Sequence, residues 1–566
     1  MTDGTTRRRS PLAVLLLTVL GAVVPGVGLL AAGRIRSGIA VLVTTVALVG
    51  GLVAYVGTSM SSLLSRALDP ATLRRGAIVA IAIALVWSAV TIVSHRALRP
   101  ATAGTGERVG GSILVGVLCL GISTPLVLGA NVLLTSRAVL GVVVKEQPKT
   151  AITGQDTVGG PLPTATPGAT HVATTSFTWS KPRLDILLIG SDAGPDRTGT
   201  RTDSMVVASI DTVTGKVLLV SIPRNLCRLR WDPASPLGQA YPNGYAVDES
   251  GCQGGDNLIN AIYGDVPAAH PNLVPSDNPG ADALALGIGW SLKLPIDYFM
   301  AVDLAAFKVI INSIGGVTVN IDTPIPVGGM HDQATGKTVT QYPSRWLMPG
   351  PAQHLGGADA LWYARGRFAS DDFDRIARQK CMISAITTQA NPTAVLTSYP
   401  ALAATLENNV LTDIPRKLLA PLAQLALKIK ASGSISSITV DTANIPAMSS
   451  DDRPNWSAVA TAIAQSIRTT DRVRGAHATA SAKLSTGPSA SASASASASA
   501  AGGQDAAGSP SSTPMVTTPT AKTSNGSRVT TDVAAGCAYS AAVAKQKTAE
   551  WTASYGSMYD AQGNRR

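Results

Sequence analysis

Four long apolar runs at the start of the chain constrain its fold more than any other feature. These runs cover about residues 11–32, 38–57, 76–94 and 112–135. A helix needs roughly 20 apolar residues to cross a bilayer, and each run is close to that length. The first run is not a cleaved signal peptide, because further runs follow it directly. The sequence therefore predicts a multi-span helical membrane segment over residues 1–144.

The positive charge of the chain belongs to this segment. The formal net charge is +11, yet residues 1–150 alone hold fourteen Lys and Arg against four Asp and Glu. Lys and Arg beside apolar spans set membrane orientation, and here they favour an external position for the chain beyond residue 134. A re-entrant first run, broken by Pro25 and Gly26, is one way to keep the N-terminus inside. No basic patch with interleaved aromatic residues indicates a nucleic-acid partner.

Composition divides the remaining chain into five parts. Residues 145–178, rich in Thr, Pro and Gly, predict a linker. Residues 179–390 alternate strand and helix patterns, which predicts a three-layer α/β/α domain around a mixed sheet. Residues 391–475 predict a helical extension of that domain with one strand near 437–440. The Ala- and Ser-rich tract 476–526 predicts a disordered spacer, and the sequence assigns no role to residues 527–566.

Several elements of the α/β domain can be placed from the sequence. The run LDILLIG predicts a buried strand that ends at Gly190 and Ser191. Two more strands, MVVASID and KVLLVSIPR, are joined by a turn at Thr214 and Gly215. Helices are predicted at 256–263, 280–292 and 303–314, and a further strand at 315–325.

Cysteine usage agrees with an external domain. Cys119 lies in the fourth apolar run, and four cysteines follow the membrane segment. Disulfides persist outside the cytoplasm, and four cysteines allow three pairings. We expect Cys227 to pair with Cys252 across one loop, which leaves Cys381 for Cys537. The alternative is that all four are free buried thiols.

Charged residues gather in one stretch, Leu361–Lys380, which holds Arg365, Arg367, Arg375, Arg378, Asp371, Asp372 and Asp374. Arg365 and Arg367 are two positions apart, so on a β-strand they would share a face. From Asp371 the pattern is helical and places Asp372, Arg375 and Gln379 on one side. Guanidinium groups bind phosphate oxygens bidentately, so the stretch predicts a clamp for a multiply charged phosphate. The alternative is a solvated helix with ion pairs along its surface.

Other polar residues lie at the predicted strand ends. Asp192 follows the first strand, Arg201 and Asp203 precede the second, and Arg224 ends the third. Two carboxylates with phosphate oxygens suit a Mg²⁺ ion. Together with the arginines they suit a diphosphate, since phosphoryl transfer depends mainly on positioning and charge neutralisation. We expect Arg365 and Arg367 to face the same cavity as Asp192.

These residues form a set that resembles the successive signature blocks of the LytR-CpsA-Psr family. The resemblance covers about residues 183–390, and the blocks are LLIGSDAGPDRTGTRTDSM, VSIPRN, FMAVDLAAF with INSIGGVTVNI, and LWYARGRFASDDFDRIARQK. The resemblance implies an enzyme on the outer face of the membrane that uses Mg²⁺, or Mn²⁺ as an alternative. This enzyme would move a glycopolymer with its linking phosphate from a polyprenyl diphosphate carrier to peptidoglycan. The apolar N-terminus and the low-complexity tail are similar to those of actinobacterial members.

The resemblance also implies roles for individual residues. Asp192 and Asp203 would be associated with the metal. Catalysis would fall to Asp372, Arg224, Arg365, Arg367 and Arg375. The diphosphate would be bound by Arg201, Arg224, Arg365, Arg367, Arg375 and Gln379. The chain departs from the family pattern where Ala193 follows Asp192 in place of a frequent Arg, and where Asn225 follows Arg224 in place of a frequent Asp.

Two other interpretations stay open at this point. A polyprenyl diphosphate hydrolase would use the same site with water as the acceptor. A non-catalytic wall-associated or regulatory membrane protein would have no need of clustered carboxylates and arginines.

Overall fold

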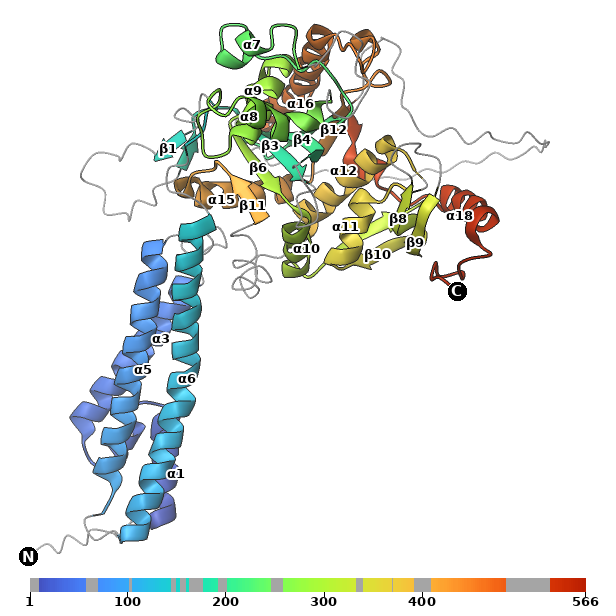
Figure 1. Cartoon of the computed structure of the whole chain (residues 1–566). Coiled ribbons are helices and arrows are strands. Elements are labelled where there is room, and N and C mark those ends of the chain that lie inside the picture. The colour runs from blue at the N-terminus through green and yellow to red at the C-terminus, as the bar shows by residue number, and fades with distance from the viewer. Residues whose placement is uncertain are drawn as a thin grey trace, which may run out of the picture.

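The computed structural model describes an α/β domain and a group of apolar helices that run away from it (Figure 1). The described residues are 10–56, 70–100, 104–143, 149–152, 159–161, 177–191, 201–245, 258–331, 339–368, 370–390, 409–484 and 530–566.

The four apolar runs form helices, and the first run is broken. The helices are α1 (Pro11–Val23), α2 (Val27–Ala31), α3 (Ile35–Val56), α5 (Pro70–Leu98) and α6 (Thr105–Val143). The break falls at Pro25 and Gly26, where Gly26 has φ 102°, a conformation that glycine tolerates. Among the described helices, those over Ala71–Leu98 and Thr105–Thr135 are long and apolar enough to cross a membrane. The structure therefore offers two candidate spans where the sequence predicted several.

A seven-stranded mixed sheet forms the centre of the α/β domain, in the order β11-β6-β3-β4-β5-β12-β13. Its strands are β3 (Arg183–Ser191), β4 (Thr202–Asp211), β5 (Val217–Ile222), β6 (Tyr298–Val302), β11 (Val410–Thr412), β12 (Ile435–Thr439) and β13 (Thr531–Asp532). β3, β4 and β5 are antiparallel neighbours, whereas β6 and β12 run parallel to β3 and β5. The predicted turn is confirmed, since Gly215 N donates to Asp211 O at its closing end. The domain is thus mixed α/β, as the sequence predicted.

Helices cover both faces of this sheet because its strands alternate in side-chain direction. Leu187 and Ile189 of β3 belong to one hydrophobic core, together with residues of η2 (Ile259–Ala261), α8 (Ile262–Ala269), α9 (Pro279–Leu292) and α16 (Trp456–Leu484). Leu184 and Ile186 point to the other face and pack with residues of α15 (Leu419–Ser432). Short elements complete this part: β1 (Gly159–Pro161), β2 (Phe177–Trp179), α7 (Pro236–Ala240), η3 (Arg416–Leu418) and η4 (Pro446–Met448).

A third core lies beside the sheet, under two antiparallel strand pairs. The pairs are β7 (Val317–Ile321) with β10 (Gly350–Leu355), and β8 (Ile325–His331) with β9 (Val339–Leu347). The helices α10 (Leu304–Ser313), α11 (Gly357–Arg365) and α12 (Asp372–Gln389) accompany them. Tyr363 of α11 and Met382 of α12 are buried in this core. It therefore joins the helices that carry the charged stretch.

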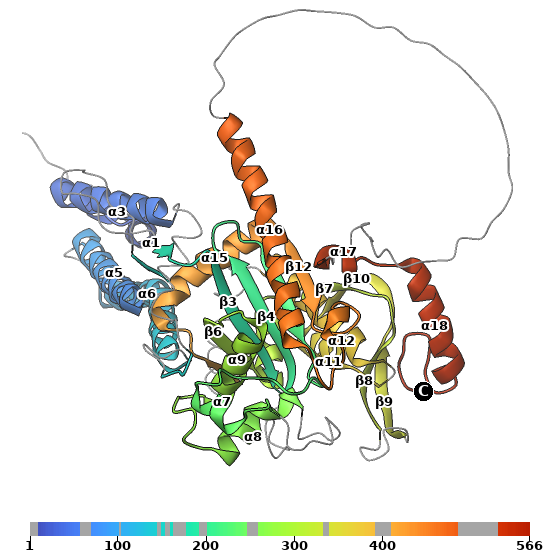
Figure 2. The same cartoon turned by 90° about the horizontal axis from the view of Figure 1, so that it is seen from above.

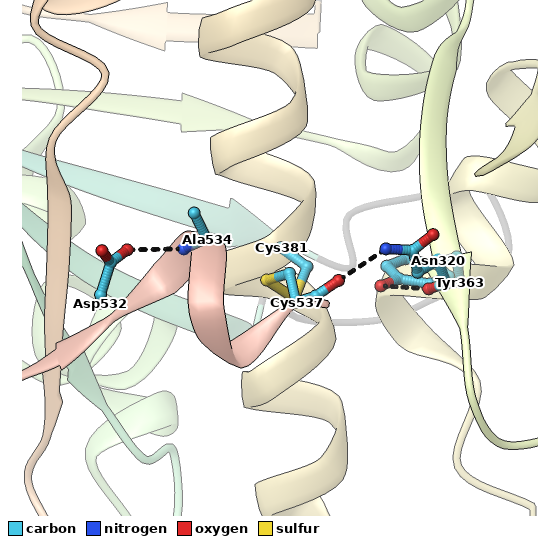
Figure 3. The surroundings of a disulfide bond; sticks show 6 residues. All are labelled: Asn320, Tyr363, Cys381, Asp532, Ala534 and Cys537. Carbon is cyan, nitrogen blue, oxygen red and sulfur yellow. Dashed lines mark hydrogen bonds between the residues drawn. A yellow bond between two sulfur atoms is a disulfide. The ribbon is translucent and has the colours of Figure 1, made fainter. Parts of the chain in front are cut away.

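The C-terminal segment 530–566 returns to the domain. β13 pairs with β12 at the sheet edge, and α17 (Val533–Gly536) and α18 (Ala541–Tyr555) follow. A disulfide joins Cys537 to Cys381 of α12, and Cys537 O accepts a hydrogen bond from Asn320 of β7 at 2.9 Å (Figure 3). α18 lies beside β8 and β9 in both views of the domain (Figures 1 and 2). Cys227 is also disulfide-bonded, whereas Cys252 lies outside the described residues.

Segments on both sides of the predicted α/β domain are attached to it. Residues 391–475 were predicted as an extension of this domain, and their strands β11 and β12 belong to the same sheet as β3. The predicted linker contacts the domain over its first described part. Ala151 N donates to Asp282 at 2.8 Å, and Lys149 N donates to Asp277 at 2.9 Å. The central part of the predicted spacer, beyond residue 484, lies outside the described residues.

Candidate active site

A cavity of about 390 Å³ opens where β3 and β5 end and β4 begins. The sheet register explains this meeting point, since Gly190 of β3 lies opposite Ser204 of β4, and Met205 of β4 lies opposite Ile222 of β5. Arg224 follows β5 directly. The first turn of α12 completes the polar side, which is lined by Arg201, Asp203, Arg224, Arg365, Arg367, Arg375 and Gln379. The strand ends therefore bring together residues that lie far apart in the sequence.

Asp372 is the centre of the ionic contacts at this site. Its carboxylate accepts hydrogen bonds from Arg367 Nη1 at 2.7 Å and from Arg224 Nε at 3.3 Å. Arg375, one helical turn further along α12, lies 3.3 Å away. The Asp371 side chain caps the helix by accepting from Asp374 N at 2.8 Å, and this start of α12 orients Asp372 and Arg375. One carboxylate is thus shared by three guanidinium groups.

Arg224 links Asp372 to the sheet. Its Nη1 donates to Asp203 Oδ1 at 2.7 Å, and Arg375 Nη2 donates to the Asp203 backbone oxygen at 3.2 Å. The arrangement is partly buried, since Arg375 is 3% exposed while Arg367 at the mouth is 41% exposed. The exposure of the arginine side chains therefore increases from Arg375 at the floor of the site to Arg367 at its opening.

Electrostatics shift the pKa values of these groups. Burial opposes ionisation of Asp372, but Arg375, Arg367 and Arg224 outweigh it and hold the pKa of Asp372 below its ordinary value. Burial lowers the pKa of Arg375 to about 10, with Asp372 acting against the shift. Burial also acts on Arg224, yet Asp203 and Asp372 raise the pKa of Arg224. At neutral pH the Asp372 carboxylate is therefore ionised, and Arg224 and Arg375 are charged.

The secondary structure predicted for Arg365 and Arg367 is wrong. Arg365 is the last residue of α11, and Arg367 lies in the loop before α12. Leu361, Trp362 and Tyr363 suggested a strand, but Leu361 and Tyr363 are buried on a helix. Both arginines nevertheless line the cavity, and the Arg365 guanidinium lies 5.1 Å from the Trp362 ring centroid. The end of α11 and the loop after it therefore bring both side chains to the cavity, although a strand was predicted to carry them.

Gln379 and Arg378 also have defined places. Gln379 accepts a hydrogen bond from Ser204 Oγ at 3.1 Å and donates to Ala364 O at 3.3 Å, so it ties α12 to both β4 and α11. Arg378 donates to the Gly366 backbone oxygen in the loop between α11 and α12. Gln379 therefore lines the site, whereas Arg378 supports the loop that carries Arg367.

The residues present fit one divalent cation with phosphate ligands. Asp203 is 36% exposed at the cavity wall and offers one carboxylate, a ligand type that Mg²⁺ uses together with phosphate oxygens and water. Asp192 lies outside the described residues, although its neighbour Ser191 lines the cavity. No group of three His, Cys, Asp or Glu occurs among the residues described. A metal here would depend on the substrate for part of its coordination.

Three helices form the apolar side of the cavity. Leu304 and Phe307 of α10 line it, whereas α9 lies against the opposite face of the sheet. The rest comes from α11 and α12, namely Leu361, Met382, Ile383 and Ile386. The i, i+4 spacing of Met382 and Ile386 was the available signal, since it marks one helix face. The cavity thus joins a cationic side to an apolar one.

Fold and site define a mixed α/β domain whose cavity is lined by arginines on one side and by apolar side chains on the other. A family model described as the LytR_cpsA_psr family matches residues 164–469, more than half of the chain. The protein belongs to this family.

Characterised relatives are similar to this chain over part of their length. A polyisoprenyl-teichoic acid–peptidoglycan teichoic acid transferase, TagU, of Bacillus mycoides is 26% identical over 245 residues, which cover 43% of this chain and 64% of the relative. TagV of Bacillus subtilis, which has the same description, is 27% identical over 216 residues, or 38% of this chain and 45% of the relative. The chain spans less than two thirds of the length of these relatives.

Solved structures with similar folds cover just under half of this chain. The crystal structure of B. subtilis TagV has 24% identity and a TM-score of 0.29, and covers 46% of this chain and 84% of that chain. The protein gbs0355 from Streptococcus agalactiae has 22% identity and a TM-score of 0.32, and covers 46% of this chain and 77% of that chain.

Proposed function

We propose that this protein is a transferase that moves a glycopolymer with its linking phosphate from a polyprenyl diphosphate carrier to peptidoglycan. The observation that carries the proposal is Asp372, an ionised carboxylate bonded to arginines that line a cavity whose other side is apolar. The relatives that are named teichoic acid transferases support the same chemistry.

The two sides of the cavity fit the two parts of the donor. A diphosphate places two phosphoryl groups side by side, and guanidinium groups bind such oxygens bidentately. Arg224, Arg367 and Arg375 surround the point where these oxygens would lie. The apolar side, with Leu304 and Phe307 of α10 and Ile383 of α12, would hold the first isoprene units. Neither side alone explains the cavity, whereas a lipid diphosphate uses both.

The reaction follows from the position of Asp372. The acceptor hydroxyl forms a new P–O bond to the phosphorus that carries the glycan, and its proton passes to Asp372. The bond to the bridging oxygen breaks, and the polyprenyl phosphate leaves with the electron pair. Before the donor binds, the arginines hold the pKa of Asp372 low. When the donor binds, its phosphate oxygens accept hydrogen bonds from these guanidinium groups in place of Asp372. The pKa of Asp372 then rises, and Asp372 becomes a better base.

The arginines also stabilise the charge that develops on the leaving phosphate. Such preorganised charge contributes most of the rate enhancement in many phosphoryl transfers. Mg²⁺ held by Asp203, with Asp192 as a second carboxylate, would supply further charge neutralisation at the diphosphate. Arg201 and Arg365 at the cavity wall would orient the donor, together with Gln379.

This function places the site outside the membrane that α5 and α6 would cross. α1 and α2 pack with these helices and α3 packs with α2, and we propose that the whole group is a multi-pass anchor. The disulfide between Cys381 and Cys537 supports an oxidising, extracytoplasmic location for the domain.

A reconstituted assay tests the proposed function. The full-length protein in lipid nanodiscs is incubated with Mg²⁺, a lipid-linked oligosaccharide labelled in its sugar, and peptidoglycan fragments. We expect the label to become attached to the fragments and Asp372→Asn to abolish this. Release of labelled sugar phosphate without attachment would instead identify a hydrolase, and no turnover of several donor types would contradict both enzymatic functions.

A further inference from the structure

The C-terminal segment 530–566 lies against the loop that carries Arg367, although the sequence assigned it no role. We propose that this segment is a positioning element for the active site. Tyr555 of α18 holds the Phe368 ring, and Phe368 fixes the backbone that presents Arg367. This inference rests on the proposed function, because it assigns Arg367 to the binding of the donor diphosphate.

The segment is attached at several independent points. β13 adds to the sheet through Ser436 and Ser437 of β12, and Cys537 is bonded covalently to α12. Ser540 N donates to Asp322 at 3.0 Å, just before α18 begins. Near the end of the chain, Gly563 O accepts from Trp346 N of β9 at 2.8 Å. The segment is therefore docked along its length, and α18 has a defined position beside the β8–β9 pair.

An aromatic cluster joins α18 to this strand pair. Its members are Trp346, Phe368, Trp551, Tyr555 and Tyr559. Trp346 and Tyr559 are almost fully buried, at 2% and 1% exposure, and the Tyr559 hydroxyl donates to Pro343 O at 2.5 Å. Aromatic rings in contact stabilise by about 0.5–1.5 kcal/mol per pair beyond their burial. The cluster is thus a small hydrophobic core that the C-terminal segment completes.

Phe368 is the member of this cluster that belongs to the active-site loop. Its ring centroid lies 6.2 Å from Trp346, 6.3 Å from Tyr555 and 6.0 Å from Tyr342. On another side it meets Gly329 of β8, where an added Cβ would lie 2.6 Å from the ring. Only a residue without a side chain leaves room for the ring at that position. Phe368 is therefore enclosed by the strand pair and by Tyr555.

The loop between α11 and α12 is held at both of its ends. Arg378 donates to Gly366 O before Arg367, and the Asp371 cap begins α12 after it. Between these points, Ser370 N donates to Arg367 O at 3.1 Å, and Phe368 packs against the aromatic cluster. Removing Tyr555 would free one side of the Phe368 ring and allow the Arg367 backbone to move. Displacements near 1 Å can cost about 100-fold in rate when they affect a positioned group.

Trp551 provides a matched control on the same helix. It lies one turn before Tyr555 and contacts Trp346 and Tyr559, but no ring contact with Phe368 is found for it among the described residues. We expect Tyr555→Ala to lower kcat for polymer transfer about tenfold or more, with Tyr555→Phe close to wild type. Trp551→Ala should destabilise the domain at least as much, yet retain kcat at a temperature where it is folded. Equal losses of kcat in both variants would overturn the proposal.

A second measurement separates this inference from the proposed function. Hydrogen exchange of the amides of residues 366–371 is measured in the full-length protein without any substrate. Tyr555→Ala should exchange these amides faster than wild type, whereas Trp551→Ala should not. Unchanged exchange in Tyr555→Ala would overturn the positioning role even if the wild type transfers polymer. Faster exchange in Tyr555→Ala, together with a wild type that transfers no polymer, would count against the proposed function but not against the positioning role.

Discussion

Arg224 donates a hydrogen bond from Nε to Asp372 across 3.3 Å, although 148 positions separate the two residues. This contact joins the end of β5 to the first turn of α12. The same guanidinium also bonds Asp203, so one side chain links the carboxylates of Asp372 and Asp203. The candidate base and the candidate metal ligand are therefore electrostatically coupled through Arg224.

Replacing Arg224 with Ala should lower polymer transfer by about 100-fold or more, because it removes a charge aimed at the diphosphate. It also leaves Asp372 and Asp203 without their shared partner. Turnover is measured in the nanodisc assay at saturating donor. Lys547→Ala removes a cation of an exposed ion pair on α18 and should leave turnover unchanged. Full activity of Arg224→Ala would remove this residue from the site.

Removing divalent cations with EDTA should abolish transfer, and added Mg²⁺ should restore it. In Asp203→Asn, the Mg²⁺ concentration for half-maximal rate should rise by about tenfold or more, because one anionic ligand is lost. A titration of rate against Mg²⁺ checks this. The same half-maximal concentration in wild type and variant would exclude Asp203 as a metal ligand.

Leu304→Gln should raise KM for a donor with a long polyprenyl chain by about tenfold, since burying a Leu side chain contributes about 1.5–3 kcal/mol. The effect should be smaller for a donor with a chain of two isoprene units. Leu411→Gln on β11 changes a 44% exposed leucine outside the cavity and serves as the control. Equal KM changes for both donors would argue against lipid binding at α10.

Asp413→Asn should change how stability depends on pH. Thr150 Oγ1 lies 2.9 Å from Asp282 and 3.3 Å from Asp413, and it also accepts from Ile152 N. One hydroxyl proton is available to two neighbouring carboxylates, and this arrangement favours a proton on one of them. Burial, reinforced by Asp282, raises the pKa of Asp413 from 3.8 to about 7.

The sign follows from proton binding. Between about pH 4 and 7 the folded state binds more protons than the unfolded state, because the pKa of Asp413 is raised by folding. The stabilisation from protonated Asp413 is therefore complete below the pKa of the unfolded state. It is lost as the pH rises through the pKa of the folded state. Its slope is at most about 1.4 kcal/mol per pH unit. The Asn amide can keep the contact with Thr150 and the hydrogen bond that Asp413 accepts from Phe299 N at 2.7 Å, and it does not titrate. Asp413→Asn should therefore flatten the stability profile and be more stable than wild type at pH 8. The free energy of unfolding is measured against pH by denaturation of both proteins. Parallel profiles would contradict the raised pKa of Asp413.

Replacing Cys381 and Cys537 together with Ser should lower the free energy of unfolding by about 2–5 kcal/mol, because the bond closes a long loop. Denaturant unfolding of the double variant measures the loss. Cys119 is the free cysteine of the described helices, and Cys119→Ser should have no such effect. A stability equal to wild type would show that strand pairing and the aromatic cluster suffice to hold the segment.

The central strands and the composition of the site could be predicted from local patterns. β3, β4 and β5 are apolar runs separated by turn residues, and their ends place Arg224 and Asp203 at one sheet edge. The start of α12 could be predicted because Asp371 is a favourable cap before a helical pattern. The expected relation of Arg365 and Arg367 to Asp192 stays a prediction, since Asp192 lies outside the described residues.

Contacts between distant segments could not be predicted in this way. Leu361, Trp362 and Tyr363 favour a strand locally, but tertiary burial of α11 decides their conformation, with Leu361 at the cavity and Tyr363 in the third core. Asp282 and Asp413 look like ordinary surface acids until the fold brings them to Thr150. Likewise, nothing near Trp551 or Tyr559 indicates that their partner is Trp346, about two hundred positions earlier.

The return of the C-terminal segment has a consequence for biogenesis. If the domain is exported from its N-terminal end, as the proposed function implies, Asp372 and the arginines emerge long before β13, Tyr555 and Tyr559. The outer edge of the sheet and the aromatic cluster would then stay incomplete until segment 530–566 had followed. A chain truncated before this segment would fold with its arginine loop unsupported.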